Sequence, residues 1–434
     1  MILIYSYTTS PRLRYSCSFI FKELLGLDCS ITIDSEEFKN YEGVGINYSS
    51  TPIRENEFRI NNTGLLFETE IKEQAIHCFD TNGYKAFFKI DNSDFAFDIF
   101  AASFYLLSRY EEYLLHTKDM YGRYAHENSL AFKESFLQQP LVNIWAKDFI
   151  AAVKKKFPSP EYRYKAQYSI FRFKPTYDID IAYSYKHKGV LRNAGGFLKV
   201  PSLERIKVLL GLQKDPFDSY TWLHELHQQN KLQATYFFLM AEKNSQYDKN
   251  ILPHKEAMWQ LIKRHAKAYM VGIHPSWQSG DDTALLKKEK EYLAEVIEKE
   301  ITASRQHYIR FNLPEGYQQL IDAGITNDYS MGYGSINGFR ASVASSFFWY
   351  NLQTEEQTGL RIHPFCFMDA NSFYEQHFTA AQAYEELLHY LKVCKEVYGT
   401  LITIWHNNFL GTAKEFKGWR EVYEQFIKVV NGEA

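Results

Sequence analysis

Two carboxylates stand two residues apart near the middle of the chain, in the segment Pro175-Thr-Tyr-Asp178-Ile-Asp180. They follow an apolar and aromatic run over 168–173 that is typical of a β-strand. Because residues i and i+2 of a strand point to the same side, Asp178 and Asp180 are expected to project into one small volume. Two like charges this close need a cation or a shared proton. The pair therefore indicates either a metal ligand beside a general base or an Asp-rich turn.

Histidines follow other predicted strands. His274 comes directly after a strand predicted over 268–273, and His406 directly after one predicted over 400–405. Imidazole and carboxylate groups are the usual ligands of catalytic divalent metals, with one position left open for water. A single His after a strand is usually only a hydrogen-bonded loop residue. The concurrence of Asp, His and His at three strand ends favours a metal site.

Strands alternate with helices through the second part of the chain, and such repeated βα units build parallel sheets, open or closed into a barrel. We predict an incomplete (β/α)7 barrel over 166–434, with its chemistry at the carboxyl ends of the strands. The seven predicted strands span 168–177, 234–240, 268–273, 305–311, 325–331, 360–366 and 400–405.

The first part of the chain, residues 1–160, is predicted to form a smaller α/β domain. Pro158-Ser-Pro160 is expected to be the linker. Expected strands span 30–33, 43–46 and 64–67, and expected helices span 101–113 and 141–156. This part contains no strong chemical motif. The charges of Arg109, Glu111 and Glu112 are predicted to lie on a solvated helix face, and the loop residues Asp119 and Arg123 receive no role.

Charge and composition give no support to several classes of protein. The 434 residues carry 49 Lys and Arg against 52 Asp and Glu, a net charge of -3 that gives no reason to expect nucleic acid or an anionic membrane surface. No stretch has the roughly 20 apolar residues of a membrane span. The five Cys have no paired spacing, and the N-terminus lacks the basic region of a signal peptide. We expect a cytoplasmic protein.

The second part resembles the polysaccharide deacetylases of the NodB-homology type, a group similar to carbohydrate esterase family 4. Thr176-Tyr-Asp178-Ile-Asp180 matches the family's first motif with one residue inserted between the carboxylates. Leu401-Ile-Thr-Ile-Trp-His406 matches its last motif. The chain looks like a divergent branch with an extra N-terminal α/β domain. The resemblance implies a metal-dependent hydrolase that removes N- or O-acetyl groups from an acetylated sugar or oligosaccharide.

The resemblance also implies roles for single residues. Asp178 would be the catalytic base, Asp180 a metal ligand and His406 the catalytic acid. His274 matches the first of two metal-binding histidines in the family's second motif. Arg305 is the best match to the arginine that orients the base.

The second histidine of the family's pair is missing, because its position holds Gln278. A neutral amide is a poor ligand for a borderline-soft divalent ion. His307 shares a strand face with Arg305, so we predict that His307 supplies the third ligand. Three polar or aromatic residues near the same strand ends are assigned to substrate contacts: Trp277, His363 and Asp369.

Two alternatives stay open. The missing histidine is what a degenerate, non-catalytic deacetylase-like protein would show, one that binds a carbohydrate or a partner. A metal hydrolase of other small amides is the second alternative. The expected cofactor is a divalent metal, with Zn in first place and Co, Ni and Fe also open. The sequence gives neither the sugar nor the oligomeric state.

Overall fold

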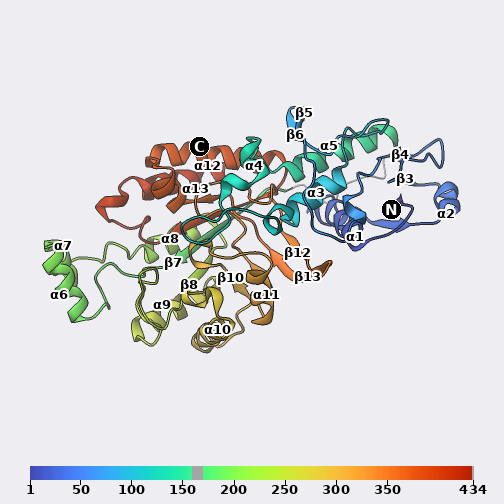
Figure 1. Ribbon diagram of the computed structural model, residues 1–434. Helices are drawn as coiled ribbons and strands as arrows, with labels where there is room; N and C mark the ends of the chain where they lie inside the picture. The colour runs from blue at the N-terminus through green and yellow to red at the C-terminus, as the bar shows by residue number, and fades with distance from the viewer. Residues whose placement is uncertain (159–169, 433–434) are drawn as a thin grey trace.

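The computed structural model describes residues 1–158 and 170–432, and its strands form two large sheets and one small two-stranded sheet (Figure 1). The first sheet has four parallel strands in the order β2-β1-β3-β4. Its strands are β1 (Ile2–Tyr5), β2 (Cys29–Thr32), β3 (Val44–Asn47) and β4 (Phe58–Arg59). The predicted strand over 64–67 is wrong, because Leu65–Phe67 forms a 3-10 turn behind Gly64, whose φ is 92°.

Helices pack around the first sheet. The most enclosed is α3 (Ile99–Leu107), all of whose side chains are buried. The helix predicted over 101–113 stops there, because Arg109 adopts a left-handed backbone with a φ of 55°. The remaining elements of this part are α1 (Pro11–Cys17), η1 (Ser18–Leu24), α2 (Ser35–Asn40), α4 (Leu130–Lys133), α5 (Leu141–Lys156) and the hairpin β5 (Phe79–Thr81) to β6 (Tyr84–Ala86).

The second sheet has nine strands in the order β12-β13-β11-β10-β9-β8-β7-β15-β14. All neighbours are parallel except the hairpin of β12 and β13. Within the described residues no strand pairing joins β14 to β12 or β13, so strand pairing leaves the sheet open. The strands are β7 (Arg172–Ile179), β8 (Thr235–Leu239), β9 (Met270–His274), β10 (Ala303–Ser304), β11 (Asn327–Asp328), β12 (Phe347–Asn351), β13 (Glu356–Ile362), β14 (Phe367–Met368) and β15 (Thr400–His406).

Helices connect these parallel strands as the βα pattern predicts, so the molecule is of the mixed α/β class. None of the described helices is long and apolar enough to cross a membrane. The helices are α6 (Val190–Lys199), α7 (Leu203–Leu209), α8 (Tyr220–Asn230), α9 (Glu256–Ala266), α10 (Thr283–Ile297), α11 (Glu315–Asp322), α12 (Ala380–Glu396) and α13 (Trp419–Val430).

The fourth predicted strand, 305–311, is mostly wrong. The strand β10 covers only residues 303–304, and residues 307–309 form a turn. Tyr308 and Ile309 have φ values of 59° and 54°, and a strand cannot continue through two successive left-handed residues. Arg305 and His307 therefore lie just beyond the strand end. The first two residues of the strand predicted over 168–177, and the border predicted between 160 and 166, lie outside the described residues.

The two sheets share one continuous apolar core. The hairpin of β12 and β13 lies beside α1 of the first part (Figure 1). The hydroxyl of Tyr15 donates to the carbonyl of Phe348 at 2.8 Å, and Arg12 Nε donates to Glu355 Oε2 at 2.9 Å. The first part is thus packed tightly onto the second.

A group of buried charges also joins the two parts, and we call it the seam cluster: Arg109, Glu111, Glu112 and Arg340. The expectation of a solvated helix face is wrong here. Glu112 Oε1 accepts from Arg109 Nε at 2.7 Å and from Arg340 Nε at 2.8 Å. Arg109 Nη2 donates to Glu111 Oε1 at 2.8 Å. These side chains are buried because Arg340, far away in sequence, supplies the countercharge and its backbone carbonyl accepts from Arg109.

Candidate active site

Asp178 is held by a buried arginine at the end of β7. Arg305 Nη1 donates to Asp178 Oδ1 at 2.8 Å, and Nη2 donates to Thr176 Oγ1 at 2.8 Å. Arg305 Nε donates to the carbonyl of Tyr329 at 3.0 Å, and the guanidinium lies over the ring of Phe237. Each of the three guanidinium nitrogens of Arg305 therefore donates one hydrogen bond. The carboxylate of Asp178 is therefore fixed in position and kept close to a positive charge.

Three imidazole rings point their Nε2 atoms at Asp180. His274 Nε2 lies 3.1 Å from Oδ1, while His307 Nε2 and His406 Nε2 each lie 3.5 Å from Oδ2. Asp180 Oδ1 is buried but has no hydrogen-bond partner among the described residues. Ligand atoms of Asp180, His274 and His307 all lie within 4.8 Å of one another, an arrangement that could hold a metal ion. A carboxylate whose two oxygens face three imidazole nitrogens is a donor set that suits a divalent cation.

In the two candidate ligand histidines, His274 and His307, the second ring nitrogen, Nδ1, also has a partner within hydrogen-bond distance. His274 Nδ1 lies 2.5 Å from the carbonyl of Arg305, and His307 Nδ1 lies 3.1 Å from Asp248 Oδ1. Such contacts set the tautomer and leave Nε2 free to bind a metal. Gln278 belongs to this supporting layer, because its Nε2 donates to Asp248 Oδ2 at 3.1 Å. The residue that replaces the family's second histidine thus helps to position the carboxylate behind His307.

His406 has a carboxylate behind it as well. Its Nδ1 lies 2.6 Å from Asp369 Oδ1, and its backbone N–H donates to Asp369 Oδ2 at 2.7 Å. In the sheet His406 is directly opposite Asp178, on the neighbouring strand β15. The proposed acid and the proposed base therefore sit side by side, with Asp180 two residues further along.

Carboxylates next to two histidines of the site raise the pKa of both rings. Burial lowers the pKa of His307, but the charge of Asp180 and hydrogen bonds to Asp180 and Asp248 raise it to about 9. Burial likewise lowers the pKa of His406, while Asp369 and Asp180 raise it well above its ordinary value. The same carboxylates would attract a cation. The residues present therefore fit a divalent metal.

These groups line a cavity of about 520 Å³. Its floor contains Asp178, Asp180 and the three histidines, and aromatic residues form much of its wall. The volume is in the range of small-molecule binding sites. The wall residues with aromatic rings are Tyr121, Tyr308, Tyr374 and Phe409.

Residues of the first part complete the wall of this cavity. Arg123 Nη1 donates to the carbonyl of Tyr308 at 2.8 Å, its Nε donates to Asp119 Oδ2 at 2.6 Å, and its guanidinium lies over the ring of Tyr121. Tyr308 is one of the two left-handed residues after His307. Strained backbone persists only where the surroundings hold it. Arg123 therefore supports the turn that carries His307.

The three predicted substrate contacts lie in different surroundings. Asp369 is fully buried behind His406 and is not part of the cavity wall. His363 contacts Ser346 and Asn327 through its two ring nitrogens, and burial lowers its pKa to about 3. Trp277 stacks on Tyr247 with ring centres 3.9 Å apart. None of the three belongs to the lining of the cavity.

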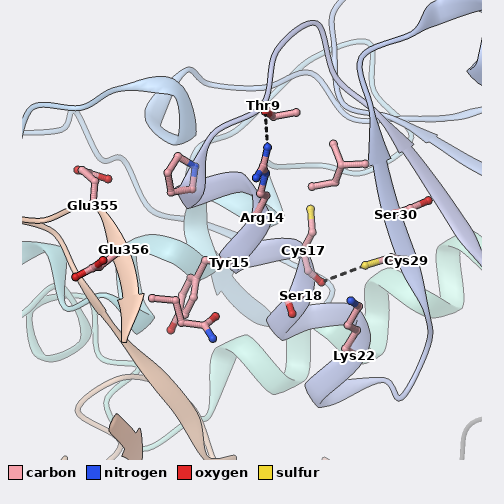
Figure 2. Close-up of a pocket in the computed structure, with 13 residues that line it drawn as sticks. Thr9, Arg14, Tyr15, Cys17, Ser18, Lys22, Cys29, Ser30, Glu355 and Glu356 are labelled. Atoms are coloured by element: carbon pink, nitrogen blue, oxygen red, sulfur yellow. Dashed lines mark hydrogen bonds between the residues drawn. The ribbon is translucent and has the colours of Figure 1, made fainter. Parts of the chain in front are cut away.

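A larger hollow of about 630 Å³ lies elsewhere, between α1, β2 and the β12–β13 hairpin. Figure 2 shows Arg14 bonded to Thr9 on one side and Glu355 and Glu356 on the other. Its lining contains no histidine, and its acidic groups come only from the hairpin. It offers no pairing of a base with an acid or a metal ligand, so we place the candidate active site in the smaller cavity.

Sequence reasoning missed three contributors to the site. Asp248 lies in the irregular segment between β8 and α9, where no periodicity marks a direction. Tyr121 and Arg123 belong to the first part, and no local signal places them beside β10. Gln278 was the one usable signal in the sequence. It stands where the family has its second metal-binding histidine, so another residue must replace that ligand, and a further residue must position the replacement.

A family model described as a family of unknown function, DUF7033, matches residues 2–158. None of the curated proteins matches the chain. Among solved structures, a protein described as a polysaccharide deacetylase from Mycobacterium smegmatis aligns with 14% identity and a TM-score of 0.40, covering 61% of this chain and 84% of that one. PuuE allantoinase aligns with 10% identity and a TM-score of 0.40, covering 60% and 84%. The polysaccharide deacetylase Bc1974 from Bacillus cereus aligns with 11% identity and a TM-score of 0.31, covering 60% and 88%. TM-scores of this size do not by themselves establish a shared fold.

Proposed function

We propose that this protein is a metal-dependent hydrolase that removes an N- or O-acetyl group from a carbohydrate. The observation that carries the proposal is the convergence of Asp180, His274 and His307 beside the Asp178–Arg305 pair and His406. A metal site, a carboxylate base and an imidazole acid on one cavity floor are the parts that amide and ester hydrolysis needs.

The candidate ligands are Asp180, His274 and His307. Two imidazoles and one carboxylate are a set typical of zinc in hydrolases, with Co, Ni and Fe as alternatives. When bound, the metal would supply Lewis acidity toward a water molecule and the acetyl carbonyl. Asp248 and the carbonyl of Arg305 keep the two rings in the orientation that presents Nε2.

Proton transfer is assigned to two residues. Asp178, fixed by Arg305, takes a proton from the attacking water. His406, held by Asp369, gives a proton to the nitrogen or oxygen of the leaving sugar. Their side-by-side position on β7 and β15 allows both to reach one substrate group. Arg305 and Asp369 are positioning residues, since each acts through another side chain.

The aromatic wall favours a ring-shaped substrate. Tyr121, Tyr308, Tyr374 and Phe409 offer flat apolar faces with polar edges, which suit the mixed apolar and hydroxylated surface of a sugar. The resemblance to polysaccharide deacetylases in the Asp178–Asp180 and His406 motifs makes the acetyl group the expected point of attack.

One experiment separates this proposal from a non-catalytic carbohydrate-binding protein. The purified protein is analysed for metal and then incubated with acetylated oligosaccharides, with released acetate as the readout. We expect roughly one equivalent of metal and steady acetate release, both lost in His307→Ala. Gln318→Ala, on the exposed surface of α11, is the matched control and should keep both. A protein with neither metal nor acetate release would be a binding protein instead.

A further inference from the structure

The segment between β7 and α8 carries an unusual surface. Its two helices, α6 and α7, project away from the rest of the molecule, at the far left of Figure 1. Apolar side chains on this α6–α7 hairpin face outward: Leu191 is 90% exposed and Leu198 is 83% exposed. Single exposed apolar residues are ordinary, but a cluster of them marks an interaction surface. The other strongly exposed members are Val190, Val200, Leu203, Leu210 and Leu212.

The hairpin is also strongly basic. Residues 186–214 contain five Lys, two Arg and one Glu, a net charge of +6 in a chain whose total is -3. Along α6 the apolar residues recur at positions 190, 191, 194, 197 and 198, which form one helical face. Arg192 and Lys199 lie on the opposite face. A short amphipathic helix with a basic polar face is the pattern of helices that lie in a membrane interface.

The base of the hairpin is rigidly attached to the rim of the candidate active site. Asp215 accepts from the backbone N–H groups of Ser184 and Tyr185, each at 2.8 Å, and so ties its two ends together. Asn407, the neighbour of His406, donates to the carbonyls of Ile181 at 3.1 Å and Phe217 at 2.9 Å. The two ends of the hairpin are therefore held by side-chain hydrogen bonds next to His406.

We propose that the α6–α7 hairpin docks the protein onto the surface of an anionic lipid bilayer. Its apolar side chains would enter the boundary between headgroups and acyl chains, and its Lys and Arg side chains would contact the anionic headgroups. Between the helices lies an apolar groove of about 520 Å³, lined by Val190, Phe197, Ile206 and Leu209. Both helices are far too short to span a bilayer, so the contact is at the surface.

The positive charge of the hairpin favours an anionic bilayer over a second copy of the chain, and its apolar face favours a bilayer over a nucleic acid. A second copy docked through the same face would bring two +6 segments together, and like charges repel. A nucleic acid would neutralise the charge but would leave the leucines in water. An anionic bilayer satisfies the charge and the apolar face at once. Docking through this hairpin would also bring the rim near His406 close to the bilayer, since α6 is only about 15 Å long.

The test is co-sedimentation of the full chain with vesicles of phosphatidylcholine, with and without phosphatidylglycerol. We expect binding that requires phosphatidylglycerol and weakens as salt is added. Leu191→Ser/Leu198→Ser/Leu203→Ser and Arg192→Glu/Lys199→Glu/Lys207→Glu should each weaken binding by roughly tenfold or more. Their melting temperatures should match the wild type, because these side chains are not in the core.

The matched control is Leu115→Ser/Met120→Ser, which removes two exposed apolar residues outside the hairpin and should leave vesicle binding unchanged. Absence of wild-type binding to the anionic vesicles overturns the proposal. So does a triple serine variant that binds as well as the wild type. Light scattering that shows a dimer abolished by the serine substitutions, without vesicle binding, would identify a contact between copies instead. None of these readouts depends on hydrolytic activity.

Discussion

Buried charges gather in two regions of this molecule, the seam cluster between the two parts and the floor of the candidate active site. In the seam cluster, Arg109 and Arg340 face Glu111 and Glu112, and each charged group has partners within hydrogen-bond distance. On the cavity floor, Asp180 Oδ1 has no hydrogen-bond partner within residues 1–158 and 170–432, although three imidazoles surround its carboxylate. The same types of residue are thus satisfied in one region and left open in the other.

This difference indicates that the charges of the seam cluster stabilise the structure, whereas those of the cavity floor are available for chemistry. A closed cluster joins surfaces and specifies how they meet, because any missing partner leaves a charge uncompensated. An open cluster beside a cavity can still accept a cation or exchange a proton. Removal of one member should therefore change binding and turnover in the open cluster, and stability in the closed cluster.

The largest effect is expected from Asp180→Ala. This change removes the only carboxylate of the candidate metal site, so the protein should lose its metal, and acetate release should fall below detection. The fold should survive, because Asp180 is at the cavity and not in the core. Metal analysis and circular dichroism measure both outcomes, with Asp281→Ala on an exposed turn as the control. Full metal occupancy in Asp180→Ala would place the ion elsewhere.

Asp178→Asn should separate the base from the metal. The amide keeps the size of the side chain but cannot take a proton, so kcat should fall by roughly 10²–10⁴-fold. Metal content should remain at the wild-type level, because Asp178 is held by Arg305. Activity near that of the wild type would remove Asp178 from the mechanism.

Glu112→Gln should destabilise the seam without affecting the chemistry. It leaves two buried guanidinium groups short of countercharge, at a cost of about 3–5 kcal/mol in the free energy of unfolding. Burial raises the pKa of Glu112, but Arg340 and Arg109 lower it further, to about 2. The unfolded chain therefore binds the proton more tightly. The stabilisation is present above about pH 4.5 and is lost as the pH falls toward 2.

Urea unfolding checks this prediction at two pH values. The difference between wild type and Glu112→Gln should be large at neutral pH and should shrink near pH 3. The rate of acetate release per folded molecule should be the same in both proteins. A loss of activity that exceeds the loss of folded protein would show that the seam cluster acts on the site.

Asp248→Asn should weaken metal binding by roughly 10–100-fold, because the carboxylate behind His307 sets its tautomer and raises its basicity. At saturating metal the rate should recover, which distinguishes support of a ligand from a role in proton transfer. Gln278→Ala should change metal affinity in the same direction but less, since Gln278 acts on His307 only through Asp248. Competition with a metal chelator measures both affinities.

The smallest effect is expected from Arg123→Ala. Arg123 shares one property with each of the two regions. It joins the two parts, as the seam cluster does, but it ends at the wall of the cavity. Loss of its bond to the carbonyl of Tyr308 should lower kcat/KM by roughly tenfold, while metal is retained. Lysine at this position should restore part of the loss. Unchanged kinetics in Arg123→Ala would mean that the turn after His307 keeps its conformation without the hydrogen bond from Arg123.

The two-residue alternation of side-chain direction along a strand was enough to predict the positions of many residues on the cavity floor. Asp178 lies inside β7 and Asp180 directly follows it, as the two-residue period requires, and His406 ends β15 as expected. The period also brought Arg305 and His307 to one side although β10 ends at Ser304, because Gln306 keeps an extended backbone before the turn. Their assigned roles in binding and catalysis stay predictions.

Long-range partners explain what the sequence did not reveal. Arg109 and Glu112 have the local pattern of an exposed helix face, and only Arg340 makes their burial tolerable. Asp248 lies in a loop without a period. The net charge of -3 concealed the basic α6–α7 hairpin, because an average over the chain cannot show how charge is distributed. The β12–β13 hairpin was missed because its first strand was not recognised.

The seam cluster also has a consequence for how the chain is made. Glu112 and Arg340 are 228 residues apart, so a ribosome that adds about 5–20 residues per second needs roughly 10–45 s to deliver the second after the first. During that time the N-terminal part can pair Glu112 with Arg109, but the surface that will meet β12 stays exposed. The nascent chain therefore exposes an apolar and charged surface until its partner residues have been synthesised. Final closure of the two parts is expected to be a late step in the folding of the chain.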